Sequence, residues 1–258
     1  MVLKIDNLFS VENFVVIITG SGKGIGYELS KSFAKNKSFV YSISLAFPNK
    51  IPKNLNKYMF QEKCDVRNED KFREICKRIY KKHGRIDVLI NNAGITLTSS
   101  SDRSYSVDDW NKTLDVNLTA AFKCSNSVFE YMYKKRSGRI INITSINSEL
   151  GFPKNPYYVA SKGGLKMLTK ALARDWGIYG IRVNNLGPGY FRTEMTKDSY
   201  SNLRKRKSRS HRTMLRRWGS IEELIGPAIF LASDASSYIT GQDLYVDGGW
   251  ISNGLSDD

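Results

Sequence analysis

Histidine, cysteine and proline are scarce in this chain of 258 residues, which contains 2, 3 and 6 of them. With only His83 and His211, a Ser-His-Asp hydrolase or a metal site with several histidine ligands is hard to build. The cysteines, at positions 64, 76 and 124, are too far apart for a metal or redox pattern, so no metal site is predicted. Acid–base chemistry would therefore fall to tyrosine, lysine or carboxylate side chains.

Long apolar runs are also missing. No stretch approaches the roughly 20 residues that a membrane-spanning helix needs, and the first residues show no secretory hydrophobic region. The content of 41% hydrophobic and 25% charged residues is that of a globular protein. Together with the cysteine pattern, this predicts a reduced, cytoplasmic protein without a membrane partner.

Acidic residues are few, 25 against 40 basic ones, and the formal net charge is +15. We interpret most of this excess as a solvated, lysine-rich surface. Residues 204–217 are different, because they contain eight arginines and lysines and no acidic residue. Binding of nucleic acid through this segment is a remote alternative, since no aromatic residue is interleaved before Trp218.

Strand-like and helix-like segments alternate along the chain, which predicts βαβ units around a parallel sheet. Strands are expected at residues 14–19, 39–44, 59–65, 88–90, 139–144, 181–186 and 244–246. Helices are expected at 24–35, after Asn68, from 107, through the 120s and 130s, at 157–176 and at 221–232. No linker divides the chain, so residues 1–258 are predicted to form one α/β domain.

A glycine turn joins the first strand to the first helix. Gly20 permits a tight turn, Gly24 lets the backbone approach a pyrophosphate, and Gly26 allows close packing of the helix. The helix N-terminus then faces the anion. This arrangement predicts a nucleotide-binding site.

The end of the second strand bears on the choice between nicotinamide cofactors. A carboxylate there binds the ribose hydroxyl of NAD, whereas a basic neighbourhood accommodates the 2′-phosphate of NADP. Residues 42–46 contain no carboxylate, and Lys23 lies inside the glycine turn. The sequence therefore favours NADP over NAD, while a solvent-facing Lys23 would leave the choice open.

Tyr158 and Lys162 stand four residues apart and share one face of the predicted helix. An ammonium beside a phenol lowers the pKa of the phenol, which would then exchange a proton with an alcohol. A bound cofactor would carry the hydride. Tyr157 is five residues from Lys162 and lies further round the helix, so Tyr158 is the candidate.

With these residues in place, the chain resembles a classical short-chain dehydrogenase/reductase over nearly its whole length. The motifs that carry the resemblance are residues 19–26, Asp65-Val66, residues 91–94, Asn117, Ser145, Tyr158 with Lys162, and Pro188-Gly189. The resemblance implies a Rossmann-type, doubly wound parallel sheet of about seven strands. It also implies a homotetramer or homodimer and a covering segment over the substrate at about residues 190–220.

The resemblance implies roles for four catalytic residues. Tyr158 would be the general acid or base, and Lys162 would lower its pKa and contact the nicotinamide ribose. Ser145 would orient the substrate oxygen, and Asn117 would hold a water that relays protons from Lys162. The implied cofactor contacts are Gly20, Ser21, Lys23, Gly24, Ile25, Gly26, Asp65, Val66, Asn92, Ala93, Gly94, Tyr158, Lys162, Pro188, Gly189 and Thr193.

Several stretches are similar to gluconate 5-dehydrogenases, among them residues 145–151, 160–169, 188–196 and 217–219. The implied reaction interconverts an alcohol and a ketone on a sugar acid. Two stretches depart from that subgroup, the basic residues 197–217 and the residues 97–103 at the substrate mouth. We therefore expect an anionic or polyhydroxylated sugar substrate, with reduction of a 3-oxoacyl carrier protein as the alternative.

Overall fold

Seven parallel strands form one sheet in the computed structural model, which describes residues 5–254. Their order is β3-β2-β1-β4-β5-β6-β7. The strands are β1 (Val15–Thr19), β2 (Phe39–Ser44), β3 (Met59–Lys63), β4 (Val88–Asn91), β5 (Gly138–Ile143), β6 (Ile181–Pro188) and β7 (Asp243–Val246). The chain runs outward from β1 to β3 and returns to the other side of β1, so the strand order reverses between β1 and β4. The predicted doubly wound sheet is confirmed.

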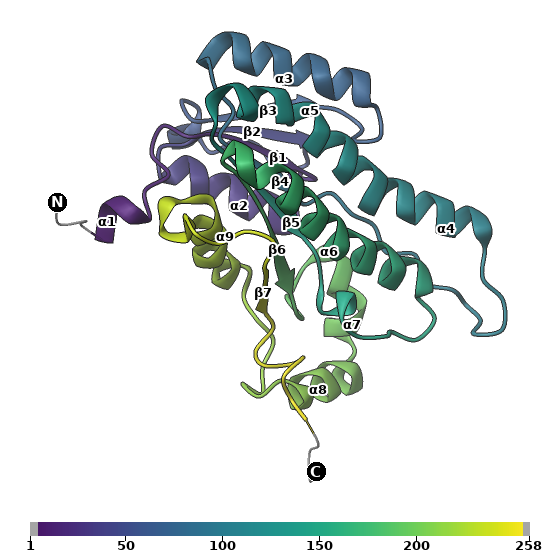
Figure 1. Cartoon of the computed structure of the whole chain (residues 1–258). Helices are drawn as coiled ribbons and strands as arrows, with labels where there is room; N and C mark the ends of the chain where they lie inside the picture. Colours follow the sequence, from purple (N-terminus) through teal and green to yellow (C-terminus); the bar gives the residue numbers. More distant parts are fainter. Residues whose placement is uncertain (1–4, 255–258) are drawn as a thin grey trace.

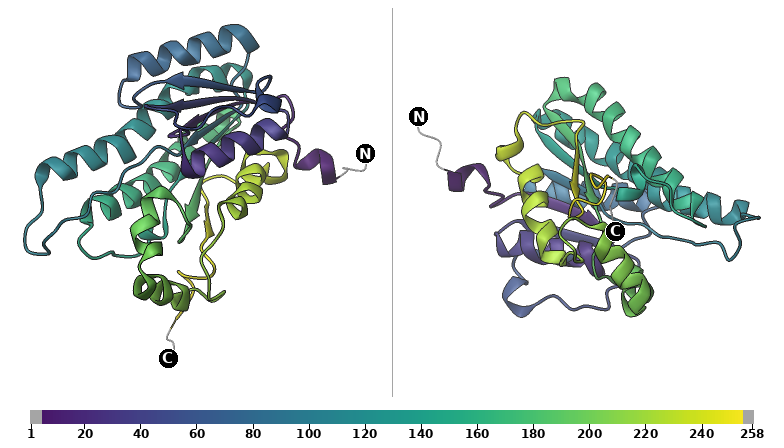
Figure 2. Two further views of the ribbon diagram at one scale, coloured as in Figure 1. Left: turned by 180° about the vertical axis from the view of Figure 1, so that it is seen from behind. Right: turned by 90° about the horizontal axis from the view of Figure 1, so that it is seen from below.

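Helices cover both faces of this sheet (Figures 1 and 2). The α-helices are α1 (Ile5–Leu8), α2 (Gly24–Lys35), α3 (Glu69–His83), α4 (Val107–Leu114), α5 (Ala120–Lys135), α6 (Pro156–Trp176), α7 (Lys197–Ser201), α8 (Leu203–Arg212) and α9 (Ile225–Ala232). Helices α3, α5 and α6 pack on one face, and α2 and α9 pack on the other. Within residues 5–254, no helix is long and apolar enough to cross a membrane.

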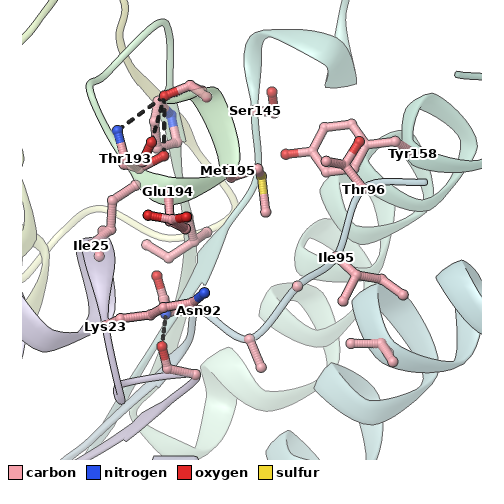
Figure 3. Close-up of a pocket in the computed structure, with 18 of the residues that line it drawn as sticks. Lys23, Ile25, Asn92, Ile95, Thr96, Ser145, Tyr158, Thr193, Glu194 and Met195 are labelled. Atoms are coloured by element: carbon pink, nitrogen blue, oxygen red, sulfur yellow. Dashed lines mark hydrogen bonds between the residues drawn. The ribbon is translucent and has the colours of Figure 1, made fainter. Parts of the chain in front are cut away.

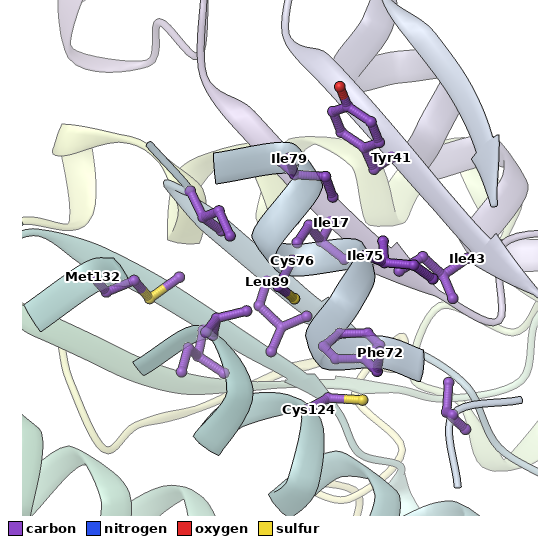
Figure 4. Packing of buried hydrophobic residues seen from close by; sticks show 14 of the residues in the cluster. Ile17, Tyr41, Ile43, Phe72, Ile75, Cys76, Ile79, Leu89, Cys124 and Met132 are labelled. Atoms are coloured by element: carbon purple, nitrogen blue, oxygen red, sulfur yellow. The ribbon is translucent and has the colours of Figure 1, made fainter. Parts of the chain in front are cut away.

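The central strands β1 and β4 are buried on both sides, because successive side chains point to opposite faces and helices cover both faces. In β1, Val15 and Ile17 join the core beneath α3 and α5, while Val16 and Ile18 join the core beneath α2 and α9. Figure 4 shows the first of these cores, where Phe72, Ile75 and Ile79 of α3 lie in one cluster with Ile17 of β1. The unbroken run of apolar residues in this strand is therefore what a central parallel strand requires.

Most predicted elements are found within one or two residues of their expected limits. Asn68 caps α3 as expected, with its side-chain oxygen accepting a hydrogen bond from the Lys71 amide at 3.0 Å. The helix expected at 221–232 begins instead as a 3₁₀ turn over Ile221–Leu224. There the Ser220 amide donates to the Glu223 carboxylate at 2.8 Å, and Pro227 has no N–H for an α-helical bond to Glu223.

The helical stretch after residue 107 contains a feature that the sequence did not reveal. Between α4 and α5 the chain forms a single π turn over Asp115–Thr119. Such turns insert an extra residue into a helix and are frequent at functional sites. This one contains Asn117, which is 1% exposed.

Candidate active site

A cavity of about 970 Å³ opens at the carboxyl ends of the strands. The reversal of strand order between β1 and β4 places a crevice at this edge, which is where open α/β sheets bind ligands. Figure 3 looks into the cavity, with Ser145 and Tyr158 on one side and Lys23 and Ile25 of the glycine turn on the other. Residues 190–220 contribute part of the wall, among them Tyr190 and Met195.

The glycine turn has the backbone geometry of a phosphate-binding loop. Gly20 and Gly24 have φ values of 64° and 59°, which residues with a side chain rarely adopt. A Cβ at Gly20 would lie 2.6 Å from the Cα of Ala93, so the turn approaches the loop after β4 very closely. Lys23 caps α2 without a side-chain hydrogen bond, and amides at a helix N-terminus are suited to bind an anion.

Two of the predicted cofactor residues lie beneath the cavity instead of lining it. Ser21 is fully buried, and its hydroxyl donates to the carbonyl of Ile18 at 2.9 Å. A Cβ on Gly26 would lie 2.7 Å from the carbonyl oxygen of Gly20. Both residues therefore hold the turn in shape, and their contact with a cofactor would be indirect.

Of the other predicted site residues, Asn117 is buried and does not line the cavity, whereas the rest do. Those that line it are Gly20, Lys23, Gly24, Ile25, Asp65, Val66, Asn92, Ala93, Gly94, Ser145, Tyr158, Lys162, Pro188, Gly189 and Thr193. Asn92 also braces the glycine turn, because its side-chain amide donates to the carbonyls of Thr19 and Gly20 at 2.9 and 3.0 Å.

The end of the cavity beside β2 and β3 has basic side chains. Ser44, Leu45 and Ala46 line it where β2 ends, and none of them is a carboxylate. Asp65 is paired with Arg67, whose Nη2 lies 2.6 Å from its Oδ2, and this pairing holds the pKa of Asp65 below its usual range. Arg67 lines the cavity as Lys23 does, and the sequence reading did not single it out.

Three elements bring the four predicted catalytic residues together. Tyr158 and Lys162 lie on α6, and the Lys162 ammonium is 5.6 Å from the centre of the Tyr158 ring. Ser145 follows β5 and is 7% exposed. Asn117 comes from the π turn, where its side-chain nitrogen donates to the Ile95 carbonyl at 2.9 Å and to Ser161 Oγ at 3.0 Å.

Asn117 and Lys162 border the same small space beside Gly94. A Cβ built on Gly94 would lie 3.4 Å from Asn117 Oδ1 and 3.6 Å from Lys162 Nζ. The Lys162 ammonium also donates to the carbonyl of Ile143 at 2.7 Å. Lys162 and Tyr158 therefore lie at the wall of the cavity, and the buried Asn117 amide lies close to Gly94, which also lines it.

The electrostatics of the pair differ from the prediction. Burial raises the pKa of Tyr158 above 10.0, although a hydrogen bond with Ser145 opposes the rise. Burial also lowers the pKa of Lys162 from 10.5 to about 8. The predicted lowering of the tyrosine pKa by lysine is therefore corrected, because burial has the largest influence on Tyr158 and the Lys162 ammonium donates to Ile143 instead.

Comparison with known proteins agrees with this geometry. A model of the family described as enoyl-(acyl carrier protein) reductase matches residues 20–251. The chain belongs to the short-chain dehydrogenase/reductase family. As a member of this family it is an NAD(P)-dependent oxidoreductase that acts on CH–OH groups, so the predicted family and enzyme class are confirmed.

Three relatives illustrate the similarity within the short-chain dehydrogenases. A gluconate 5-dehydrogenase of Gluconobacter oxydans (strain 621H) is 36% identical over 253 residues, which are 94% of this chain and 96% of the relative. The crystal structure of a gluconate 5-dehydrogenase from Burkholderia cenocepacia J2315, in complex with NADP and tartrate, is 34% identical with a TM-score of 0.87 and covers 95% and 98% of the two chains. A 3-oxoacyl-[acyl-carrier-protein] reductase of Thermotoga maritima is 34% identical over 93% of this chain and 99% of its own length.

The structure adds residues that the reading of the short-chain dehydrogenase motifs missed. Asn155, three residues before Tyr158, lines the cavity and is 4% exposed. Its side-chain nitrogen donates to Thr96 Oγ1 at 2.7 Å, and its side-chain oxygen is buried without a hydrogen-bond partner among the described residues. Arg209 is the member of the basic run 204–217 that lines the cavity. The run itself was the signal for Arg209, whereas nothing in the sequence marked Asn155.

Proposed function

We propose that this protein interconverts a secondary alcohol and a ketone on a sugar acid, with NADP as the preferred cofactor. The observation that carries the proposal is the meeting of Ser145, Tyr158 and Lys162 at the wall of a cavity whose other end is a glycine turn, with Asn117 buried against Ser161 of α6. Similarity to gluconate 5-dehydrogenases over nearly the whole chain supports the substrate class.

The glycine turn and the loops after β2, β3 and β4 fit a dinucleotide. The close approach at Gly20 leaves no room for a side chain, and the amides that begin α2 are available to a pyrophosphate. Lys23 and Arg67, with no carboxylate at the end of β2, would accommodate a 2′-phosphate. A bound nicotinamide cofactor supplies the hydride or accepts it.

The protein side chains then move the proton and hold the substrate. Tyr158 gives a proton to the ketone oxygen or takes it from the alcohol, and Ser145 donates a hydrogen bond to that oxygen. A positively charged nicotinamide would add to the Lys162 charge and lower the pKa of Tyr158 from its raised value in the ligand-free protein. Asn117 and Lys162 border the space for a relaying water beside Gly94.

The covering segment, residues 190–220, and the assembly of subunits belong to the same proposal. Tyr190, Met195 and Arg209 come from this segment to the cavity, as expected of a cover over the substrate. Assembly into dimers or tetramers is supported by large apolar side chains that α4 and α5 leave exposed, among them Trp110 and Phe122.

The test is a substrate panel followed by nicotinamide absorbance, with both cofactors and the Tyr158→Phe variant. We expect kcat/KM to be highest for a keto sugar acid with NADPH, and Tyr158→Phe to lose about 10²- to 10⁴-fold in turnover because it removes the proton donor. NADP should still bind to the variant. Faster reduction of an acetoacetyl thioester than of any sugar acid would instead favour the alternative function, reduction of a 3-oxoacyl carrier protein. The similarity to the reductase of Thermotoga maritima is the reason to include this substrate.

A further inference from the structure

Arg209 is set apart from its basic neighbours by its position in the active-site cavity. Helix α8 also carries Arg204, Lys205 and Lys207, which are exposed and do not line that cavity. Lys207 borders a separate hollow on the outer side of the helix. Among the basic residues of this helix, Arg209 is therefore the one whose side chain lines the active-site cavity.

Aromatic rings hold this guanidinium in place. Its central carbon lies 4.6 Å from the centre of the Tyr190 ring and 5.9 Å from that of Phe152, and both rings line the cavity. Tyr190 is itself fixed between Trp218 and Trp250, at centroid distances of 5.2 and 4.9 Å. The cation is thus positioned by ring faces and by a hydrogen bond with the Tyr190 side chain, and these contacts leave its Nη1 available to a ligand.

A nitrogen of the same guanidinium lacks an acceptor. Arg209 Nη1 is buried and has no hydrogen-bond partner among the described residues. Nearby Arg217 is different, because its two terminal nitrogens donate to the Glu223 carboxylate at 2.6 and 2.8 Å. A buried guanidinium nitrogen without an acceptor is unfavourable, so a ligand that supplies one is favoured.

We propose that Arg209 binds the carboxylate of the substrate and thereby selects acids over neutral polyols. This inference rests on the proposed function and extends it to one residue. Asn155 Oδ1 is the complementary feature, a buried acceptor without a partner on the α6 side of the same cavity. A hydroxy acid supplies an acceptor for Arg209 and a hydroxyl donor for Asn155.

The first test compares an acid with the neutral polyol of the same chain length, D-gluconate and D-glucitol. Arg209→Gln removes the charge at similar size, and Arg209→Lys keeps the charge without the planar fork. The matched control is Arg204→Gln, on the exposed side of α8.

We expect Arg209→Gln to raise the KM for D-gluconate by about 10- to 100-fold, in line with loss of a charge-assisted hydrogen bond. Its kcat/KM for D-glucitol should change by less than about 3-fold, because the neutral polyol has no carboxylate for Arg209 to bind. Loss of a hydrogen bond to a charged group has a larger effect than this. Arg209→Lys should recover part of the loss, and Arg204→Gln should match the unmodified protein. Equal losses on the acid and the polyol, or no loss on either, would overturn the role of Arg209.

Calorimetric titration of the NADP-loaded protein with D-gluconate separates this inference from the proposed function. If the protein oxidises D-gluconate and Arg209→Gln binds it equally well, the function stands and the inference falls. If D-gluconate is bound through Arg209 but not oxidised, the inference stands and the proposed function falls. If the protein neither binds nor oxidises it, both are wrong.

Discussion

At the scale of single residues, Lys162 differs from the surface lysines of the protein in its burial and in its hydrogen-bond partner. It is 4% exposed, and its ammonium has the Ile143 carbonyl as an acceptor instead of a carboxylate. Burial lowers its pKa to about 8. Because the pKa is about 10.5 when the chain is unfolded, the charged form costs folding free energy at every pH below about 8, and the cost disappears as the pH rises toward 10.5.

Lys162→Met should therefore stabilise the cofactor-free protein at pH 7 while it abolishes turnover. The expected gain in the free energy of unfolding is about 1–3 kcal/mol, reduced from the full linkage value because the Ile143 carbonyl loses its donor. The gain should shrink between pH 8 and pH 10.5. Urea unfolding at pH 7 and pH 9.5 measures it, with Lys77→Met on the exposed side of α3 as the control. A loss of stability of equal size at both pH values would contradict the argument.

The identities of the reacting residues were readable from the sequence, but their properties were not. Spacing together with the glycine turn indicated Tyr158 and Lys162, and the resemblance to short-chain dehydrogenases implied Ser145 and Asn117. The direction of the Tyr158 pKa depends on burial, which only the fold determines. Asn155 and Arg209 were missed as individual residues because their importance lies in buried atoms without partners, and a sequence contains no such signal.

At the scale of elements, the proposed binding of NADP depends most directly on the backbone geometry of the glycine turn. A Cβ at Gly26 would lie 2.7 Å from the Gly20 carbonyl and closer still to the Asn92 amide, so α2 would have to move away from the turn. Gly226 near the start of α9 provides a matched comparison, since a Cβ there meets nothing within 4 Å.

Gly26→Ala should weaken binding of NADP by at least about 10-fold and cost about 1–3 kcal/mol of stability, as expected for overpacking. Gly226→Ala should leave the affinity for NADP unchanged and add up to about 1 kcal/mol, since alanine is the better helix former. Fluorescence titration with NADP and thermal unfolding give the two quantities. Unchanged affinity in Gly26→Ala would show that the turn tolerates the displacement.

Elements with a clear periodicity of hydrophobic residues were predicted from the sequence, whereas elements whose shape depends on tertiary contacts were not. The strands and α2, α3 and α6 follow from hydrophobic patterning and end signals such as Asn68. The π turn at Asp115–Thr119 has a helical pattern in the sequence, and its extra residue is revealed only by the packing of Asn117 against Ile95 and Ser161. The short helices α7 and α8 are rich in charge and bury no residue, so the sequence shows no hydrophobic periodicity that would have predicted them.

At the scale of the whole molecule, the alternation of strands and helices was sufficient to predict the parallel sheet, because right-handed crossovers leave few other arrangements. One group that the sequence did not mark helps to hold the sheet together. Asp87, just before β4, is fully buried. Its carboxylate accepts hydrogen bonds from the Val15 amide of β1 at 2.8 Å, from Arg85 at 2.6 Å and from Lys135 of α5 at 3.0 Å.

These partners set the response of the molecule to acid. Burial raises the pKa of Asp87, but hydrogen bonds from Arg85, Val15 and Lys135 outweigh burial and leave the pKa below its usual value. A carboxyl group whose pKa is lower in the folded state contributes stability that is fully present above its unfolded pKa of about 3.9. That contribution is lost as the pH falls through the lowered value.

Asp87→Ala should therefore cost about 3–5 kcal/mol of stability at pH 7, the usual penalty for removing one partner of a buried ion pair. The difference in the free energy of unfolding between this variant and the unmodified protein should narrow steadily below pH 4. In this range the Asp87 carboxylate of the unmodified protein itself takes up a proton and loses its ion pairs. Urea unfolding at pH 7 and at pH 3 measures both values. Glu130→Ala, which breaks an exposed pair with Lys134 on α5, should change stability little at either pH. A difference at Asp87 that stayed constant with pH would show that the residue acts through its backbone position, and that its charge does not stabilise the sheet.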